Sequence, residues 1–179
     1  MNAGIVGQLL EIRRDLSYNQ RMLEKAPTFE LTSVATNRIV GVPASLPSVL
    51  ILLFQAEETA NVAQNINELI RARHEASEDL IVASLVNLSG IPRFMRKMGN
   101  KMLAMSYKKA ADAFPDGHDP ADYIVLLPDW DGDVFRSFGV GDVSKKAFMV
   151  IIDHEGNIVF KRQGGNLGKA ALRELDKLV

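Results

Sequence analysis

The feature that most constrains the fold is an apolar run at residues 49–54, "VLILLF", which is followed by a helical pattern and a second apolar run. β-Branched and leucine side chains occupy both faces of the first run, as is typical of a central strand covered on both sides. Residues 59–76 then predict a helix, and 80–88 predict another strand. The expected apolar stripe of this helix is Val62, Ile66, Leu69 and Ile70. The three segments predict a βαβ unit with parallel strands and a right-handed crossover.

The rest of the chain alternates short strands and helices around this unit. Two short strands, a helical region interrupted near Gly99, a further strand, a hairpin and a closing helix are expected at 29–31, 39–42, 92–113, 123–127, 148–161 and 166–179. A chain of 179 residues suits a single domain. On folding, such a domain removes about 70% of its unfolded surface from water, so it needs no metal or disulfide for stability.

Residues 4–25 predict a helix ahead of this domain. Its apolar positions step by three and four, with Asn19 as the one polar member, and they are Ile5, Leu9, Ile12, Leu16 and Leu23. Such a seam belongs either to a helix that lies on its own domain or to one that pairs with a second copy. Pro27 ends the segment. We therefore divide the chain into an N-terminal helix, 1–25, and a domain, 26–179, and expect a homodimer through the helix.

Four stretches resemble the thioredoxin superfamily, specifically its redoxin branch of peroxiredoxin-like and thiol-reductase-like proteins. They are "APTFEL" at 26–31, "VLILLFQA" at 49–56, "IVLLPDWDGDVFRSFGV" at 124–140 and "FMVIIDHEGNIVFKRQG" at 148–164. Their order and spacing match that family over residues 26–179. The resemblance implies an α/β fold of the thioredoxin-like kind: a three-layer α/β/α sandwich with a mixed central sheet, here extended by the N-terminal helix.

The resemblance fails at the residues that would carry the chemistry. The chain contains no cysteine. The peroxiredoxin pattern Thr-x-x-Cys falls on Thr59 and Val62, and a Cys-x-x-Cys pattern falls on the same two positions. Where reductases of the family have a cis-proline, this chain has Ala147, next to Lys146. Without a thiolate, the family's peroxide reduction and disulfide exchange are excluded for this chain.

The strand-to-helix turn still predicts a site, because a helix N-terminus carries free N–H groups and a positive dipole end. We expect either a self-capped helix start, with Glu57 and Glu58 satisfying those donors and Thr59 as the cap, or a retained ligand pocket. That pocket would be a cleft between the turn, Trp130 and the segment before the last hairpin. The candidate binding residues are Glu57, Glu58, Thr59, Val62, Trp130, Lys146 and Ala147.

Residues 93–109 combine basic side chains with methionines and contain no acid. The basic residues are Arg93, Arg96, Lys97, Lys101, Lys108 and Lys109, and the methionines are Met95, Met98, Met102 and Met105. Either the methionines are buried on the sheet, or the helix docks to a protein partner or an acidic surface. Residues 112–133 then hold seven aspartates and no Lys or Arg, so the two segments can neutralise each other.

Other classes of function find little support in the composition. The net charge of −1 gives no global reason to bind nucleic acid or membrane, and no apolar run is long enough to span a bilayer. Glu11 and Asp15 near the N-terminus, without an apolar block before a cleavage site, favour a cytoplasmic protein. "DWDGD" at 129–133 lacks the spacing of a calcium loop, so we expect no metal and no other cofactor.

The sequence thus predicts a redoxin-like protein without redox cysteines that binds a ligand or partner and is non-catalytic. Two alternatives remain open. One is an enzyme of another class that uses the old active-site cleft. The other is a thiol oxidoreductase whose cysteines were lost or engineered away.

Overall fold

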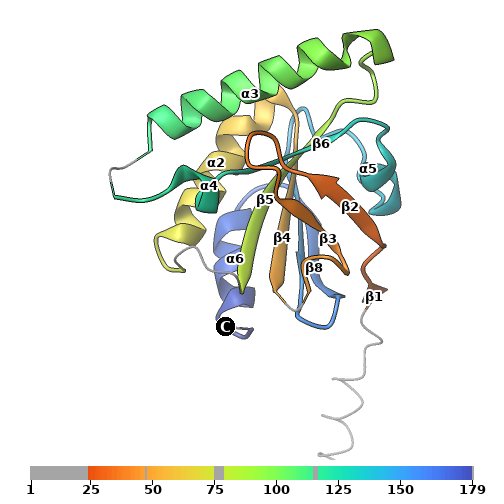
Figure 1. The fold of residues 1–179 in the computed structure, drawn as a ribbon. Coiled ribbons are helices and arrows are strands. Elements are labelled where there is room, and N and C mark those ends of the chain that lie inside the picture. The colour runs from red at the N-terminus through yellow and green to blue at the C-terminus, as the bar shows by residue number, and fades with distance from the viewer. Residues whose placement is uncertain (1–23, 47, 75–78, 115–116, 179) are drawn as a thin grey trace, which may run out of the picture.

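A computed structural model of the chain describes residues 24–46, 48–74, 79–114 and 117–178. A six-stranded mixed sheet forms its centre, in the order β1-β8-β7-β4-β5-β6 (Figure 1). The strands are β1 Glu24–Lys25, β4 Val49–Gln55, β5 Leu80–Asn87, β6 Val125–Asp129, β7 Phe148–Ile152 and β8 Asn157–Gln163. A separate two-stranded sheet pairs β2, Phe29–Thr32, with β3, Ile39–Val42.

The predicted βαβ unit is confirmed. Strand β4 leads through helix α2, Ala60–Arg71, into β5, and the two strands pair in parallel from Val49↔Leu80 to Gln55↔Val86. Strand β6 continues the parallel part of the sheet beside β5. The expected hairpin is also present, because β7 and β8 are antiparallel neighbours and β7 pairs with the other side of β4.

Two apolar clusters, one on each face of the sheet, make the core. Alternate residues of β4 serve them, so that Leu50, Leu52 and Phe54 join one cluster while Val49, Ile51 and Leu53 join the other. The second cluster includes residues of α2 and of α6, Leu167–Leu175, which cover that face. The first includes residues of the β2–β3 hairpin and of α5, Asp133–Ser137, which cover the opposite face. The expected three-layer arrangement is therefore present.

One long helix lies across an end of this sandwich. Helix α3, Arg96–Asp112, follows the short 3-10 helix η2, Arg93–Met95, and runs along the top of Figure 1. It is continuous through Gly99, so the predicted interruption there is wrong, and Gly99 is its one buried residue. A short helix, α4, Pro120–Tyr123, precedes β6, and a 3-10 turn, η1, Glu57–Thr59, precedes α2. No helix among the described ranges is long and apolar enough to cross a membrane.

The structure corrects the end of the predicted N-terminal helix. Glu24 and Lys25 are not helical but form β1, which pairs with Ile158 and Asn157 of β8. The preceding residues of the predicted helix and its seam lie outside the described part of the chain. The predicted stripe of α2 is also partly wrong, because Val62 and Leu69 are exposed and Ala63 joins Ile66 and Ile70 in the core.

Candidate functional site

The turn between β4 and α2 is built around Thr59, which is 3% exposed. Its hydroxyl oxygen accepts a hydrogen bond from the backbone N–H of Ala56 at 3.0 Å and donates one to the carbonyl of Val143 at 3.1 Å. No hydrogen bond from the first N–H groups of α2 reaches this hydroxyl. The predicted cap of α2 is therefore wrong, although the Thr59 hydroxyl does accept the N–H of Ala56, the residue at the start of η1. Thr59 joins the turn to a distant loop instead of closing the start of α2.

The loop that Thr59 contacts comes just before β7 and is itself held in place. The side-chain amide of Gln163 donates to the carbonyls of Asp142 and Lys146, at 2.6 and 3.0 Å. Ser144 donates its backbone N–H to the Asp142 carboxylate at 2.8 Å. Hydrogen bonds from Ser144, its backbone N–H first, lower the pKa of Asp142. The loop at 142–146, which we call the covering loop, thus has its own fixed shape and lies against the turn.

The two glutamates of the turn do not act as expected. Glu57 and Glu58 lie in the first turn of η1 and are exposed. Within the described residues neither carboxylate accepts a hydrogen bond from the backbone N–H groups at the helix start. They favour the positive end of the helix only through their charge. The self-capping that the sequence predicted is not observed.

Val62, Lys146 and Ala147 lie in different environments. Val62, which the sequence resemblance matched to a cysteine position, is 46% exposed on α2. Lys146 is exposed as well. Ala147 is 1% exposed and belongs to the core cluster on the α2 and α6 face of the sheet. Ala147, which the sequence resemblance matched to a cis-proline position, is therefore part of the hydrophobic core.

Trp130 contacts α3 rather than the turn. The guanidinium of Arg96 lies over its ring at 5.5 Å from the centroid and donates to its carbonyl at 3.3 Å. Gly99 faces the same ring so closely that an added Cβ would lie 2.7 Å from Cη2. A pocket of about 460 Å³ opens beside Trp130 and Arg96, with Phe29 and Leu31 of β2 on its far side. Trp130 therefore belongs to this pocket and to the α3 contact.

The aspartates of "DWDGD" each have a partner of their own. Asp129 is 2% exposed, and its two carboxylate oxygens accept the backbone N–H groups of Asp133 and Phe135 at 3.1 and 3.0 Å, which closes the start of α5. Asp131 pairs with Arg96 at 2.6 Å, and Asp133 pairs with Arg136. The sequence predicted that the basic and acidic segments neutralise each other. In the described part of the chain, one ion pair, Arg96–Asp131, joins the two segments.

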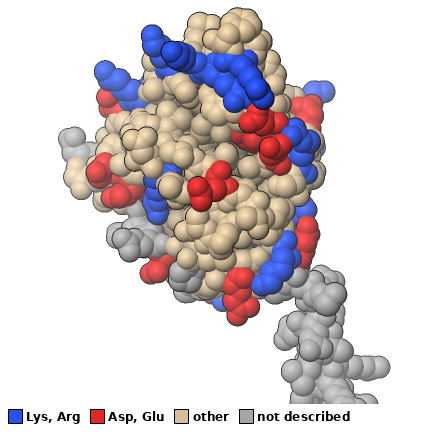
Figure 2. Space-filling model, turned by 45° about the vertical axis from the view of Figure 1, so that its right-hand side comes forward, with Lys and Arg blue, Asp and Glu red and all other residues tan. Residues whose placement is uncertain are grey.

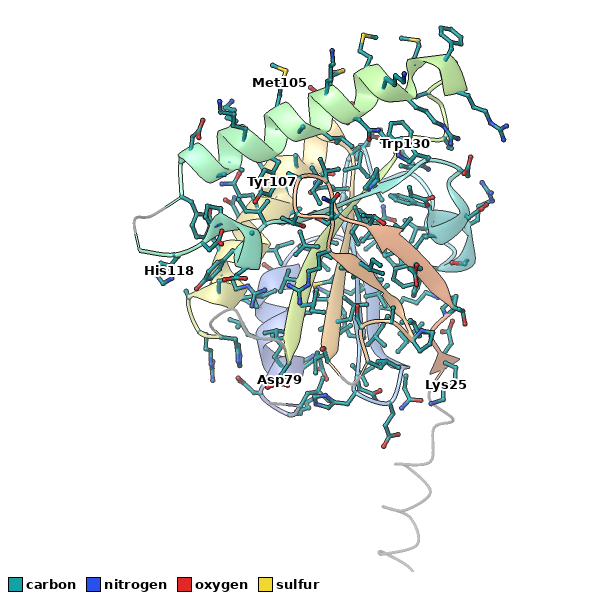
Figure 3. All side chains as sticks on the ribbon, viewed as in Figure 1. Lys25, Asp79, Met105, Tyr107, His118 and Trp130 are labelled. Carbon is teal, nitrogen blue, oxygen red and sulfur yellow. The ribbon has the colours of Figure 1, made fainter. Side chains whose placement is uncertain are left out.

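The methionines of α3 are not buried on the sheet. Met98, Met102 and Met105 are 52%, 63% and 71% exposed, and Phe94 just before the helix is 85% exposed. Met105 points away from the body of the molecule, whereas Tyr107 points back toward it (Figure 3). The alternative in which these methionines are buried on the sheet is therefore wrong for Met98, Met102 and Met105.

The sequence did not single out four residues that make these contacts: Val143, Gln163, Gly99 and, as a partner of Trp130, Arg96. Small residues on the inward face of α3 were a usable signal for Gly99, because they permit close packing. Nothing in the local sequence pointed to Val143 or Gln163.

The mixed sheet, its strand order and its covering layers define a thioredoxin-type fold. No family model and no curated protein matches the chain. The exposed lipoprotein thioredoxin Etrx1 from Streptococcus pneumoniae strain TIGR4 shares the fold with a TM-score of 0.61 at 19% identity, over 85% of this chain and 100% of that one. A thiol-disulfide oxidoreductase from Bacteroides fragilis NCTC 9343 gives 0.56 at 14%, over 85% and 99%. A thioredoxin-like protein from Aeropyrum pernix gives 0.54 at 17%, over 99% and 100%. The chain has this fold without cysteine.

Proposed function

We propose that this protein is a non-catalytic, redoxin-like member of the thioredoxin fold that acts by attaching to a larger partner through the outward face of α3. The observation that carries the proposal is the exposure of four large apolar side chains along α3 and the 3-10 turn η2 that precedes it: Phe94, Met98, Met102 and Met105. Soluble domains tolerate scattered apolar residues on their surface, but a contiguous row is typical of an interaction site.

The state of the old active-site turn supports a role without thiol chemistry. The chain has no cysteine to supply a nucleophile, and Thr59 is buried under the covering loop. An enzyme of another class that uses the same turn finds less support, since Thr59 and Ala147 are both buried and present no side chain to a substrate. We expect the purified full-length protein to reduce peroxide and insulin disulfides no faster than buffer.

A photo-crosslinking experiment tests the binding role. The photoreactive residue p-benzoylphenylalanine replaces Met102 in one variant and Ile39 in a matched control, because Ile39 is a similarly exposed apolar residue on β3, at 53%. Irradiation of producing cells should yield a covalent adduct at position 102 and none at position 39. Equal adducts at both positions, or none at position 102, would count against attachment through α3.

Self-association remains a separate proposal, based on the apolar seam at residues 4–25. Deletion of residues 1–23, which spares β1, should convert a dimer to a monomer in sedimentation analysis. A full-length protein that already sediments as a monomer would contradict it. The cytoplasmic location also stays a prediction, and the genomic codons for residues 59 and 62 would show whether cysteines were removed by engineering.

A further inference from the structure

The exposed large apolar residues of η2 and α3 form one continuous stripe. Phe94, Met98, Met102 and Met105 follow one another at steps of four, four and three residues, which places them on a single side of a helix. The helix has 17 residues and is therefore about 25 Å long. Helix α3 lies across one end of the molecule (Figure 1), and all four side chains of the stripe are more than half exposed. Met105 points away from the body of the molecule in Figure 3.

A row of lysines lies beside this stripe. Lys97 and Lys101 each directly precede a methionine of the stripe, Lys108 follows Met105 by three residues, and all three lysines are exposed. Lys and Arg side chains gather over the α3 end of the molecule in Figure 2. Among the described residues, the ion pairs of α3 involve Arg96 alone, so these three lysines are available to an outside group. The net charge of −1 conceals this local concentration of positive charge.

The charge of this face decides between its candidate occupants. A second copy that docks through its own α3 would bring lysines against lysines. The first 23 residues are no better suited, since they hold three arginines against two acidic residues. In the acidic segment of a second copy, Asp129, Asp131 and Asp133 have partners in their own molecule, whereas Asp112, Asp119 and Asp122 are exposed. A second copy carries a net charge of only −1 as a whole, so an anionic occupant from outside the chain suits this positive face better.

The shape of this face favours a broad surface over a grooved protein. The stripe is the crest of a single helix, whereas the pocket near Trp130 lies toward β2 and is lined by Arg96 alone of α3. The exposed fraction is 85% for Phe94 at one end of the stripe and 71% for Met105 further along. A flat surface placed against the stripe can therefore contact both side chains at once. Lysine stems can lie along an apolar surface while their ammonium groups extend to nearby phosphates.

We propose that this face of α3 binds the surface of an anionic lipid bilayer, with Phe94, Met98, Met102 and Met105 in the boundary between headgroups and acyl chains and Lys97, Lys101 and Lys108 on lipid phosphates. This inference rests on the proposed function, because it names the partner of the same face. It describes a helix lying on a membrane surface.

Vesicle co-sedimentation of the full-length protein tests the proposal. The protein should sediment with vesicles of phosphatidylcholine mixed with phosphatidylglycerol and stay in solution with vesicles of phosphatidylcholine alone. High salt should release it, because screening weakens exposed charge interactions. Failure to bind the mixed vesicles at low salt, or equal binding to both kinds, would overturn the proposal.

Two sets of variants locate the binding surface. Neutralising Lys97, Lys101 and Lys108 to Gln should weaken binding on the order of 100-fold, whereas the same change at Lys145, Lys169 and Lys177 should have little effect. Met98→Ser with Met102→Ser should also abolish binding, whereas Ile39→Ser should not. All altered side chains are exposed, so we expect the variants to fold. Unfolding curves that match that of the unaltered protein check this. Binding that survives both α3 variants would overturn the proposal.

A parallel measurement with poly-L-glutamate separates this inference from the proposed function. Retention on immobilised poly-L-glutamate that requires Met98 and Met102, without vesicle binding, would overturn the lipid assignment and leave a protein-binding role for the face. Vesicle binding that needs both the lysines and the methionines, with weak retention on the acidic polymer, supports the bilayer. If neither probe binds and the crosslinker at position 102 gives no adduct, the proposed function fails as well.

Discussion

The hydroxyl of Thr59 donates a hydrogen bond to the carbonyl of Val143, which lies 84 residues further along the chain. The bond joins the turn after β4 to the covering loop, at one of the two positions that the sequence resemblance matched to a cysteine. Because both atoms are buried, the contact should matter for stability more than an exposed hydrogen bond would.

Replacing Thr59 with valine keeps the shape of the side chain but leaves the Ala56 N–H and the Val143 carbonyl without this partner. We expect a loss of about 1–3 kcal/mol in the free energy of unfolding, measured by chemical denaturation. Thr59→Ser should recover most of it. Thr59→Asp should not, since a carboxylate cannot donate to a carbonyl. Recovery by aspartate would instead indicate the helix-capping role that the structure does not show.

Cysteines introduced at positions 59 and 62, which the sequence resemblance matched to a Cys-x-x-Cys pattern, should differ sharply in reactivity. Thr59→Cys puts a thiol where the native side chain is 3% exposed, and burial raises a thiol's pKa and blocks reagents. Val62→Cys puts one where the native side chain is 46% exposed. We expect the second to react much faster with Ellman's reagent, and both to react alike in denaturant. Equal native rates would mean that the turn is open.

Gly99 should resist substitution although it lies inside a helix. Alanine normally stabilises a helix by about 1 kcal/mol relative to glycine, but here its Cβ would lie 2.7 Å from the Trp130 ring. We expect Gly99→Ala to lower the unfolding free energy by about 1–3 kcal/mol and to change the fluorescence of Trp130, the one tryptophan of the chain. Gly90→Ala is the matched control, because nothing lies within 4 Å of its Cβ position.

The covering loop should loosen in acid. Hydrogen bonds from Ser144 lower the pKa of Asp142 below its ordinary value of 3.8. A carboxyl with a lowered folded-state pKa contributes stability above the unfolded-state pKa and loses it as the pH falls through the folded-state value. We therefore expect the protection of the Ser144 amide, measured against an unstructured amide at the same pH, to fall as the pH drops through the lowered pKa of Asp142. Nuclear magnetic resonance titration should show this, and Asp142→Asn should remove the pH dependence.

The sheet could be predicted because the residue types of its central strands indicate whether each face of the strand is buried. Residues 49–54 and 148–152 are apolar on both faces, and only a strand covered on both sides accommodates that. Helix α3 shows the limit of such patterns. Its periodicity identified the residues that share a side but not which side faces the protein, and the small Gly99 beneath Trp130 decided it.

The site was harder to predict because its contacts join residues that are far apart in the sequence. Thr59 was recognised as a special residue of the turn, yet its partner, Val143, comes from a loop whose sequence shows no sign of the contact. Trp130 was expected in one cleft with the turn. The close packing of Arg96 and Gly99 takes it to α3 instead.

The pairing of β1 with β8 fixes where the chain enters the domain. Strand β1 lies at the end of the molecule opposite α3 (Figure 1). The described part of the chain therefore begins at the end of the molecule opposite α3. A partner held on the outward face of α3 would be separated from this entry point by the whole domain.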